Sequence, residues 1–294
     1  CAAIVGPYSS GKTSLLESLL HVMGALPKKG NAKDKSLLGD SSVEARARGL
    51  SVEVTAAQGE FLRERWTFLD CPGAVELSQD TRNAVLVADV AIVVAEPQTE
   101  KALTLAPIFK FLDDNKIPHI LFVNKMDDSE LRVRDVMESL QAVSSRPLVL
   151  RLVPIREEGK NGDVVAGYVA LVSERAYRYH PGQPSDLVKL PEDMLPREQE
   201  AREQMLEHLA DFDDQLLEQL LSDAVPSKEA IYQQLSKDLA QDLIVPVLMG
   251  AAEQDYGVRR LLKALRHDVP GPGATRDRLG LDGGATAEVA VKIY

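Results

Sequence analysis

An eight-residue motif near the start of the chain constrains the fold more than any other feature. The motif is Gly6-Pro7-Tyr8-Ser9-Ser10-Gly11-Lys12-Thr13, and it fits the pattern GxxxxGK[ST]. The apolar residues 2–5 predict a strand before it, and the pattern after it predicts a helix that begins at Lys12. Gly6 and Gly11 let the backbone curl so that its N–H groups point at phosphate oxygens. The chain is therefore expected to contain a phosphate-binding strand–loop–helix unit.

Each polar group of this motif has an expected partner on a bound nucleotide. Lys12 is expected to reach the β- and γ-phosphates, and the Thr13 hydroxyl is expected to bind Mg²⁺. The helix that begins at Lys12 adds the partial positive charge of its N-terminus. The nucleotide-binding residues expected here are Gly6, Ser9, Ser10, Gly11, Lys12, Thr13 and Ser14.

A second motif, Asp70-Cys71-Pro72-Gly73, follows an apolar stretch at residues 66–69, which predicts a strand. A carboxylate at the end of such a strand can hold Mg²⁺, and the Gly73 N–H can bind the γ-phosphate. The same four residues are also compatible with an ordinary turn. Their position after the phosphate-binding motif favours the metal-binding interpretation.

A third motif, Asn124-Lys125-Met126-Asp127, again follows an apolar run. Guanine has two neighbouring donors, N1–H and the N2 amino group, which one carboxylate can accept, so Asp127 is expected to select guanine. Asn124 is expected to bond the base edge and neighbouring loops, and the Lys125 stem can lie along the purine ring. Alone the motif is an ordinary polar turn, but after the other two it predicts a guanine nucleotide.

The first 150 residues alternate short apolar runs with helical patterns. This alternation predicts an α/β fold, in which helices cover both faces of a mostly parallel sheet. Further strands are expected at residues 51–55, 90–95, 120–123 and 244–249. Further helices are expected from Asp80, Leu103 and Leu131, and at residues 258–267.

Residues 151–242 have a different pattern, which predicts an inserted α+β subdomain. Residues 151–155 and 164–172 are expected to form a hairpin with its turn at Asn161-Gly162. A polar stretch from His180 to Pro196 precedes two helical segments, which span residues 205–220 and 231–243 on either side of Pro226. The expected domains are residues 1–150 with 243–270, residues 151–242, and residues 271–294.

Composition narrows the function further. The net charge of −11 argues against non-specific binding to nucleic acid. The two cysteines, Cys1 and Cys71, are too few for a disulfide framework and fit a reducing cytoplasm, and no apolar run approaches a membrane span. The chain begins without Met, and residues 288–294 alternate like a half-buried strand. We therefore expect a monomeric cytoplasmic fragment, with a linker near Pro270 and a further domain after it.

With these motifs the chain resembles the translational GTPases, elongation factor G most closely, over nearly its whole length. Arg48-Gly49-Leu50-Ser51 resembles the family's Arg-Gly-Ile-Thr switch segment, and Gly250-Ala251-Ala252 resembles its Gly-Ser-Ala base loop. The long interval between Asn124 and Gly250 matches the inserted subdomain of elongation factor G, and the last strand resembles the start of its β-barrel domain. The resemblance implies a P-loop GTPase fold, GTP or GDP as ligand, and the ribosome as partner. It also implies base contacts from Gly250, Ala251 and Ala252, and Mg²⁺ bound by Thr13, Ser51 and Asp70.

The chain departs from this family at Ala74. The family has a His directly after Asp-x-Pro-Gly, where it orients the attacking water, and a methyl group cannot bond water. The chain also has Pro7 and Ser9 where the family has His and Asp, Ser51 in place of Thr, and Ala251 in place of Ser. No catalytic residue is therefore assigned, and we expect GTP binding with slow hydrolysis.

Three functions stay open at this point. The first is a translation-factor GTPase, with hydrolysis stimulated by the ribosome. The second is a GTP-dependent regulatory binding module that acts outside elongation and does not hydrolyse GTP. The third is a P-loop ATPase, against which Asp127 argues, because its carboxylate would repel the N1 lone pair of adenine.

Overall fold

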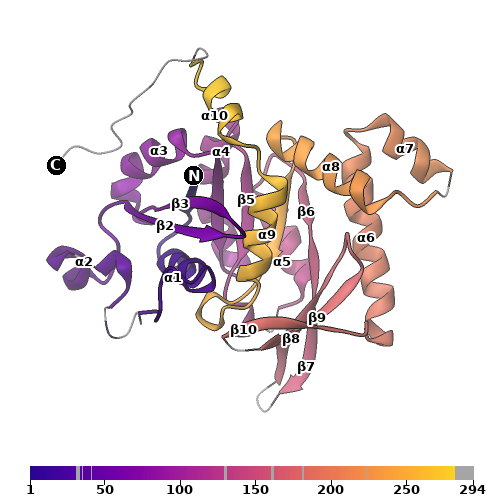
Figure 1. Ribbon diagram of the computed structural model, residues 1–294, viewed down its shortest axis with the longest axis horizontal. Coiled ribbons are helices and arrows are strands. Elements are labelled where there is room, and N and C mark those ends of the chain that lie inside the picture. Colours follow the sequence, from indigo (N-terminus) through magenta and orange to yellow (C-terminus); the bar gives the residue numbers. More distant parts are fainter. Residues whose placement is uncertain are drawn as a thin grey trace.

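A seven-stranded sheet forms the centre of the computed structural model, which describes residues 1–30, 34, 36–40, 42–128, 131–159, 162–180, 182–222 and 224–281 (Figure 1). The strand order is β2-β3-β1-β4-β5-β11-β6. Every neighbouring pair is parallel except β2 and β3, so the predicted mostly parallel α/β sheet is confirmed. The strands are β1 (Ala2–Val5), β2 (Thr55–Phe61), β3 (Glu64–Asp70), β4 (Val90–Ala95), β5 (His119–Val123), β6 (Leu148–Leu150) and β11 (Val245–Met249).

Helices cover both faces of this sheet. In Figure 1, α1 (Lys12–Val22) and α9 (Val258–Asp268) lie together in front of it, and α4 (Ala106–Asp114) and α5 (Val133–Gln141) lie behind it. The other helices of this part are α2 (Val43–Arg48), α3 (Ser78–Val87) and α10 (Pro272–Arg278). Short 3₁₀ turns occur at η1 (Leu38–Asp40), η2 (Val75–Leu77), η3 (Thr99–Leu105), η4 (Met126–Asp128) and η6 (Ala252–Gln254).

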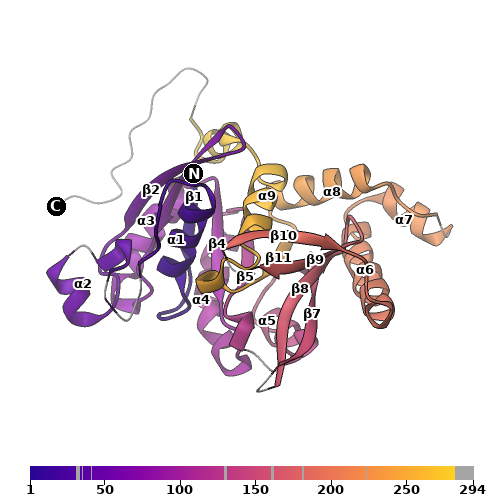
Figure 2. The same ribbon diagram turned by 60° about the horizontal axis from the view of Figure 1, so that its bottom comes forward.

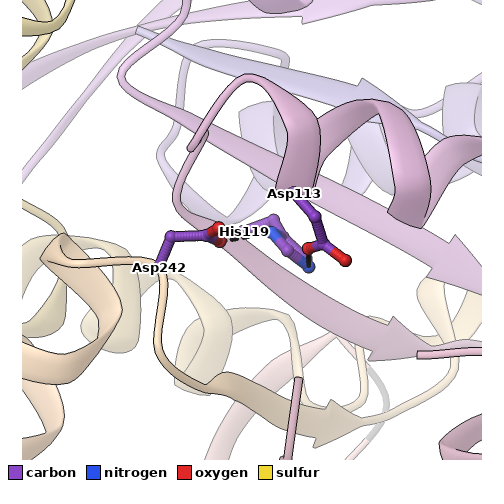
Figure 3. Close-up of side chains that lie close together, drawn as sticks. All are labelled: Asp113, His119 and Asp242. Carbon is purple, nitrogen blue, oxygen red and sulfur yellow. Dashed lines mark ion pairs between the residues drawn. The ribbon is translucent and has the colours of Figure 1, made fainter. Parts of the chain in front are cut away.

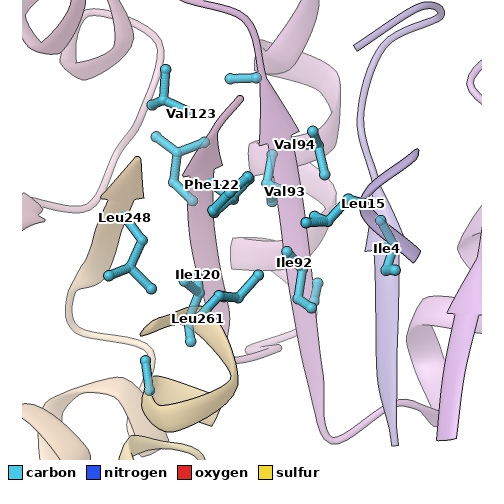
Figure 4. Close-up of a cluster of buried hydrophobic side chains, with 14 of the residues drawn as sticks. Ile4, Leu15, Ile92, Val93, Val94, Ile120, Phe122, Val123, Leu248 and Leu261 are labelled. Atoms are coloured by element: carbon cyan, nitrogen blue, oxygen red, sulfur yellow. The ribbon is translucent and has the colours of Figure 1, made fainter. Parts of the chain in front are cut away.

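The main core lies between the sheet and these helices. β4 and β5 are buried along their whole length, which explains why their sequences are apolar at every position except His119 and do not alternate. Figure 4 shows Leu261 of α9 beside Ile120 and Leu15 of α1 beside Ile4, and all four side chains are fully buried. Burying one such side chain stabilises the fold by about 1.5–3 kcal/mol.

A second, antiparallel sheet has the order β10-β9-β8-β7 (Figure 2). It consists of β7 (Leu152–Gly159), β8 (Gly162–Ala170), β9 (Arg175–His180) and β10 (Gln183–Val188). The turn η5 (Glu192–Met194) and the helices α6 (Leu195–Ala210), α7 (Asp214–Leu221) and α8 (Lys228–Ala240) follow it. Val169 of the sheet, Leu209 of α6 and Leu235 of α8 share a separate apolar cluster. The predicted hairpin is present as β7 and β8, although Asn161 of its turn lies outside the described residues.

Three edge strands differ from the sequence-based expectations. A strand was expected at residues 51–55, and this prediction is wrong, because β2 begins only at Thr55. The burial of side chains alternates along β2, since β2 is an edge strand that pairs only with β3. The polar stretch from His180 contains β10, an edge strand with no buried residue, so no apolar pattern predicted it. The three-residue strand β6, at the edge of the seven-stranded sheet opposite β2, was also not predicted.

Helix boundaries differ from the expectations as well. α3 and α5 begin two residues away from Asp80 and Leu131, and the 3₁₀ turn η3 covers Leu103 before α4 starts. The first long helical segment is split into α6 and α7, because the Asp213 carboxylate caps α7 by accepting a 3.0 Å hydrogen bond from the Leu216 N–H. α10 begins at Pro272, where a linker was expected. Residues 288–294 lie outside the described residues. In the described ranges, every helix is too short or too polar to cross a membrane.

Candidate functional site

The predicted motifs meet at the carboxyl edge of the seven-stranded sheet. The phosphate loop (residues 6–13) follows β1, the Asp70 segment (residues 70–74) ends β3, and the Asn124 segment (residues 124–127) follows β5. The base loop (residues 250–256) follows β11. β1, β3, β5 and β11 run parallel to one another, so their carboxyl ends lie on the same side of the sheet. Ligands of open α/β sheets bind at this edge.

The phosphate loop is curled on itself. Gly6, Ser9 and Gly11 have φ angles of 151°, 65° and 91°, values that L side chains rarely adopt. A Cβ at Gly6 would collide with the Val94 carbonyl oxygen, and one at Gly11 with the Asn124 amide. Both glycines are therefore required by close approach as well as by backbone angle.

Lys12 lies buried above this loop. Its Nζ donates a 2.8 Å hydrogen bond to the Pro7 carbonyl oxygen. Burial lowers the pKa of Lys12, and the nearby Asp70, Cys71 and Glu96 act in the opposite direction. A Cβ at Gly73 would collide with Lys12 Nζ, so the Asp70 segment passes directly against the phosphate loop. A buried ammonium group with a carbonyl partner is well placed to receive an anion.

Three oxygen atoms converge where Mg²⁺ was predicted. The Thr13 hydroxyl donates a 2.6 Å hydrogen bond to Asp70 Oδ2 and lies 3.3 Å from the Ser51 Oγ. The other carboxylate oxygen, Asp70 Oδ1, is buried and has no hydrogen-bond partner among the described residues. Burial raises the pKa of Asp70 to about 6, against the Thr13 hydrogen bond and the Lys12 charge. Neighbouring ligands of octahedral Mg²⁺ lie about 3 Å apart, because each Mg–O bond is about 2.0–2.1 Å long. The three oxygens therefore fit a Mg²⁺ site.

Asn124 connects the phosphate loop to the base loop. Its Nδ2 donates a 3.0 Å hydrogen bond to the Ser10 carbonyl oxygen, and its Oδ1 accepts one of 2.9 Å from the Ala252 N–H. The Met126 N–H donates a 3.0 Å hydrogen bond to the Gly250 carbonyl oxygen. Both predicted base-binding segments are thus joined by direct hydrogen bonds.

Lys125 crosses the phosphate loop in a left-handed conformation, with φ of 59°. Its Nζ donates a 2.7 Å hydrogen bond to the Ser9 carbonyl oxygen and forms an ion pair with Glu96. Glu96 is almost fully buried and also pairs with Lys101. Burial acts to raise the pKa of Glu96, but its hydrogen bonds to Lys101 and Lys125 lower it overall. Sequence reasoning missed Glu96, although its place directly after β4 puts it at the same edge of the sheet.

Lys29 is a second residue that the sequence did not reveal. Its Nζ donates to the carbonyl oxygens of Ala252 and Glu253, at 3.2 and 2.8 Å, and to Asp255 Oδ1 at 2.7 Å. No motif marks this lysine, because only the fold brings it against the base loop. Of the remaining predicted residues, Ser10 is buried, Ser14 lies on the first turn of α1, and Asp127 lies in η4.

Ala74 directly precedes η2 in an extended conformation and is half-buried. The neighbouring Val75 is 85% exposed, so the backbone here turns outward. The five histidines occupy other elements. They are His21 on α1, His119 on β5, His180 on β9, His208 on α6 and His267 on α9.

A separate cluster of possible metal ligands consists of Asp113, His119 and Asp242 (Figure 3). His119 Nδ1 lies 3.0 Å from the Ile117 carbonyl oxygen and 3.5 Å from Asp242, and Nε2 lies 4.0 Å from Asp113. Arg146 lies within ion-pair distance of both carboxylates, at 3.1 Å from Asp242 and 3.9 Å from Asp113. A cation is thus already in place, so this cluster is an ionic contact that joins α4, β5 and the segment before β11.

Known proteins resemble the chain in sequence and structure. The family described as the elongation factor Tu GTP binding domain matches residues 1–271. An elongation factor G-like protein of Synechocystis sp. is 46% identical over 291 residues, which cover 99% of this chain and 43% of that protein. Elongation factor G of Fervidobacterium nodosum is 28% identical over 281 residues, which cover 92% of this chain and 39% of that protein.

One solved structure also resembles the chain closely. A crystal structure of a Thermus thermophilus protein matches it with a TM-score of 0.83 and 26% identity, over 96% of this chain and 41% of that one. The chain thus spans less than half the length of each of these three relatives.

Proposed function

Because the chain belongs to the family of the elongation factor Tu GTP-binding domain, we propose that it binds GTP and GDP together with Mg²⁺ and changes conformation with the nucleotide. The observation that supports this most is the double role of Asn124, which bonds Ser10 of the phosphate loop and Ala252 of the base loop. One side chain thereby fixes the spacing between the segments that would bind the phosphates and the base.

The phosphates would lie against the N-terminus of α1. Backbone N–H groups of the phosphate loop and of Gly73 would donate to phosphate oxygens, and Lys12 would give up its bond to Pro7 for them. Thr13, Ser51 and Asp70 would hold Mg²⁺, which when bound supplies positive charge at the β- and γ-phosphates. Ser51 lies in an irregular segment before β2, so a γ-phosphate can change the order of this segment.

Guanine would be selected by Asp127, whose carboxylate can accept from both N1–H and the N2 amino group. The N–H groups of Ala251 and Ala252 would face the guanine carbonyl oxygen, and the Lys125 stem would lie along the ring. An ATPase is disfavoured, because the same carboxylate would face the N1 lone pair of adenine. A base that leaves polar groups of the site unpaired binds more weakly, which makes such a site selective.

GTP hydrolysis would be slow, because Ala74 provides neither a hydrogen bond nor a proton acceptor for the attacking water. This residue favours a second candidate function, a GTP-dependent regulatory module that acts outside elongation. The first candidate function is a translation-factor GTPase, and for it we propose the ribosome as partner, with the chain acting as a cytoplasmic monomer. Residues 1–150 with 243–270 would form the GTP-binding domain, residues 151–242 the inserted subdomain, and residues 271–294 the start of a further domain.

Competition binding tests the proposed ligand. Fluorescent GDP bound to the full-length protein should be displaced by GTP and GDP, but not by an equal concentration of ATP. Lys12→Ala removes a charge-assisted contact worth about 1.5–3 kcal/mol, so its nucleotide affinity should fall at least about tenfold. Displacement by ATP as readily as by GTP would overturn the guanine assignment. Unchanged affinity of Lys12→Ala would remove the phosphate loop from the site.

GTP turnover separates the two candidate functions. Stimulation of the full-length protein by ribosomes would support a translation-factor GTPase. GTP binding without measurable turnover, with and without ribosomes, would support the regulatory module.

A further inference from the structure

The base loop is closed by backbone hydrogen bonds to Tyr256. The Ala251 N–H donates a 3.0 Å hydrogen bond to the Tyr256 carbonyl oxygen, and the Tyr256 N–H donates one of 3.0 Å back to Ala251. A Cβ at Gly250 would collide with the same Tyr256 carbonyl oxygen. The position of Tyr256 therefore sets the position of the N–H groups that precede it in the loop.

The Tyr256 ring leaves the base loop and stacks on Tyr179 of β9. The ring centroids are 4.4 Å apart and the planes differ by 4°. Tyr179 in turn contacts Tyr168 of β8 at 5.5 Å, and Tyr168 stacks on Tyr177 at 5.1 Å. Four tyrosines thus form a continuous path from the base loop into the four-stranded sheet.

The Asn124 segment packs against the same sheet. Met126 and Asp127, with Gly250 and Tyr256, face Pro154, Val165 and Tyr179 across a space of only about 10 Å³. That volume is at the lower limit for a single water molecule, so the two sides are closely packed there, and beside it an open groove of about 340 Å³ separates Asp127 and Tyr256 from Val165 and Arg178. Both halves of the base-binding site therefore have the four-stranded sheet as their wall.

Tyr256 also lies close to the carboxylate that would select guanine. Burial raises the pKa of the Tyr256 hydroxyl, and the negative charge of Asp127 raises it further. Burial likewise raises the pKa of Tyr168 to about 12 and that of Tyr179 well above its usual value. All three rings are therefore neutral near neutral pH.

We propose that Tyr179 and Tyr256 are positioning residues for guanine, whose stacked rings hold the base loop beside Asp127 and so set the lifetime of the bound nucleotide. This inference rests on the proposed function. A loop held in place before binding loses less conformational freedom when the base arrives, which slows dissociation. Lys29 bonds Glu253 and Asp255 of the same loop, so loss of the tyrosine stack would leave these contacts of the loop in place.

The test measures dissociation of fluorescent GDP from the full-length protein. An aromatic pair contributes about 0.5–1.5 kcal/mol beyond its buried area, so Tyr179→Ala and Tyr256→Ala should each release GDP about two- to tenfold faster. Tyr179→Phe and Tyr256→Phe keep the stacked rings and should stay within about twofold of the wild type. The double alanine variant should be no faster than the faster single variant, because both changes remove the same stack.

Tyr232→Ala is the matched control. Tyr232 lies on α8 and its ring faces Arg151, away from the base loop. Its loss removes a similar ring and should leave GDP dissociation at the wild-type rate, with thermal unfolding recorded for every variant. A second readout is the affinity ratio of GDP to IDP, which lacks the 2-amino group. This ratio should fall in the two alanine variants and stay unchanged in the control.

Three outcomes would overturn the inference. One is that both single alanine variants release GDP at the wild-type rate and keep the wild-type GDP:IDP affinity ratio. Another is equal acceleration by the alanine and phenylalanine variants, and the third is the same acceleration in Tyr232→Ala. In all three cases the wild type still binds GDP, so the proposed function stands. Failure of the wild type to bind any guanine nucleotide would instead overturn both proposals.

Discussion

The Thr13 hydroxyl donates a 2.6 Å hydrogen bond to the Asp70 carboxylate, which joins the first turn of α1 to the end of β3. In the proposed function, Mg²⁺ would take the place of this direct bond and be held by both oxygens. The two side chains already face one another, so little rearrangement is needed when the ion enters.

Thr13→Ala should therefore weaken the Mg²⁺ dependence of nucleotide binding. Loss of one contact to a charged partner costs about 1.5–3 kcal/mol. The factor by which Mg²⁺ increases GDP affinity should therefore be at least about tenfold smaller in the variant than in the wild type. The GDP:IDP affinity ratio should not change, because Asp127 and the base loop are intact. Calorimetry with Mg²⁺ and with a chelator measures both quantities. An unaltered Mg²⁺ effect would place the ion elsewhere.

Asp127→Asn should change the base that the protein prefers. The substitution replaces an acceptor by an amide that can turn a donor toward the base, and xanthine has an oxygen at C2 that accepts from it. We expect a strong loss of GDP affinity, by about 10²-fold or more, together with a gain for xanthosine diphosphate. Competition between the two nucleotides on wild type and variant checks the exchange. A variant that keeps its preference for GDP would show that another group reads the base.

Asp238→Asn should change how stability depends on pH. Asp238 lies fully buried on α8, where Oδ1 accepts a 2.8 Å hydrogen bond from Gln234 and Oδ2 has no partner among the described residues. Burial raises its pKa to about 6. The folded chain therefore binds this proton more tightly than the unfolded chain does. The contribution of this proton to the free energy of unfolding is fully present below the unfolded pKa of about 3.9 and is lost as the pH rises through about 6.

Thermal unfolding of wild type and Asp238→Asn at about pH 5 and about pH 7.5 tests this sign. The wild type should lose more stability than the variant between the two values, since the amide cannot ionise. Other titrating groups contribute equally to both proteins. Parallel pH profiles would show that Asp238 keeps its ordinary pKa in the folded chain.

The buried parallel strands were predictable because both of their faces are covered. β1, β4, β5 and β11 are apolar at nearly every position, and the phosphate loop, the Asn124 segment and the base loop follow β1, β5 and β11. The edge strands β2 and β10 were not predictable in this way. Solvent reaches them, so their side chains carry no continuous apolar pattern.

The residues of the candidate site divide along similar lines. Residues in local motifs, such as Lys12 and Asp70, could be predicted because their proposed chemistry depends on neighbours in the chain. Glu96 and Lys29 were missed, because their partners lie on distant segments that only the folded chain brings together. The base loop was predicted only through resemblance to a family, since Gly250-Ala251-Ala252 has no side chain that would mark it.

Ala74→His should raise GTP turnover. Gly73, the residue before it, lies directly against Lys12, so a side chain at position 74 starts close to the proposed γ-phosphate site. A group that positions the attacking water or accepts its proton contributes about 10²–10⁴ in rate. Ala74 can do neither, so the wild type should bind GTP with Mg²⁺ and hydrolyse it very slowly. The histidine variant should be faster, provided that η2 lets the ring face the phosphate.

Single-turnover hydrolysis of wild type, Ala74→His and Ala74→Leu, with and without ribosomes, separates the causes. Leucine adds bulk without a hydrogen-bonding atom, so its variant should stay as slow as the wild type. If histidine accelerates hydrolysis only with ribosomes, the segment from Ala74 to η2 needs a partner to orient the ring. If ribosomes make all three proteins equally fast, the water is positioned by a group outside this chain. Rapid hydrolysis by the wild type alone would contradict the prediction, because some other residue of the chain would then have to orient the water.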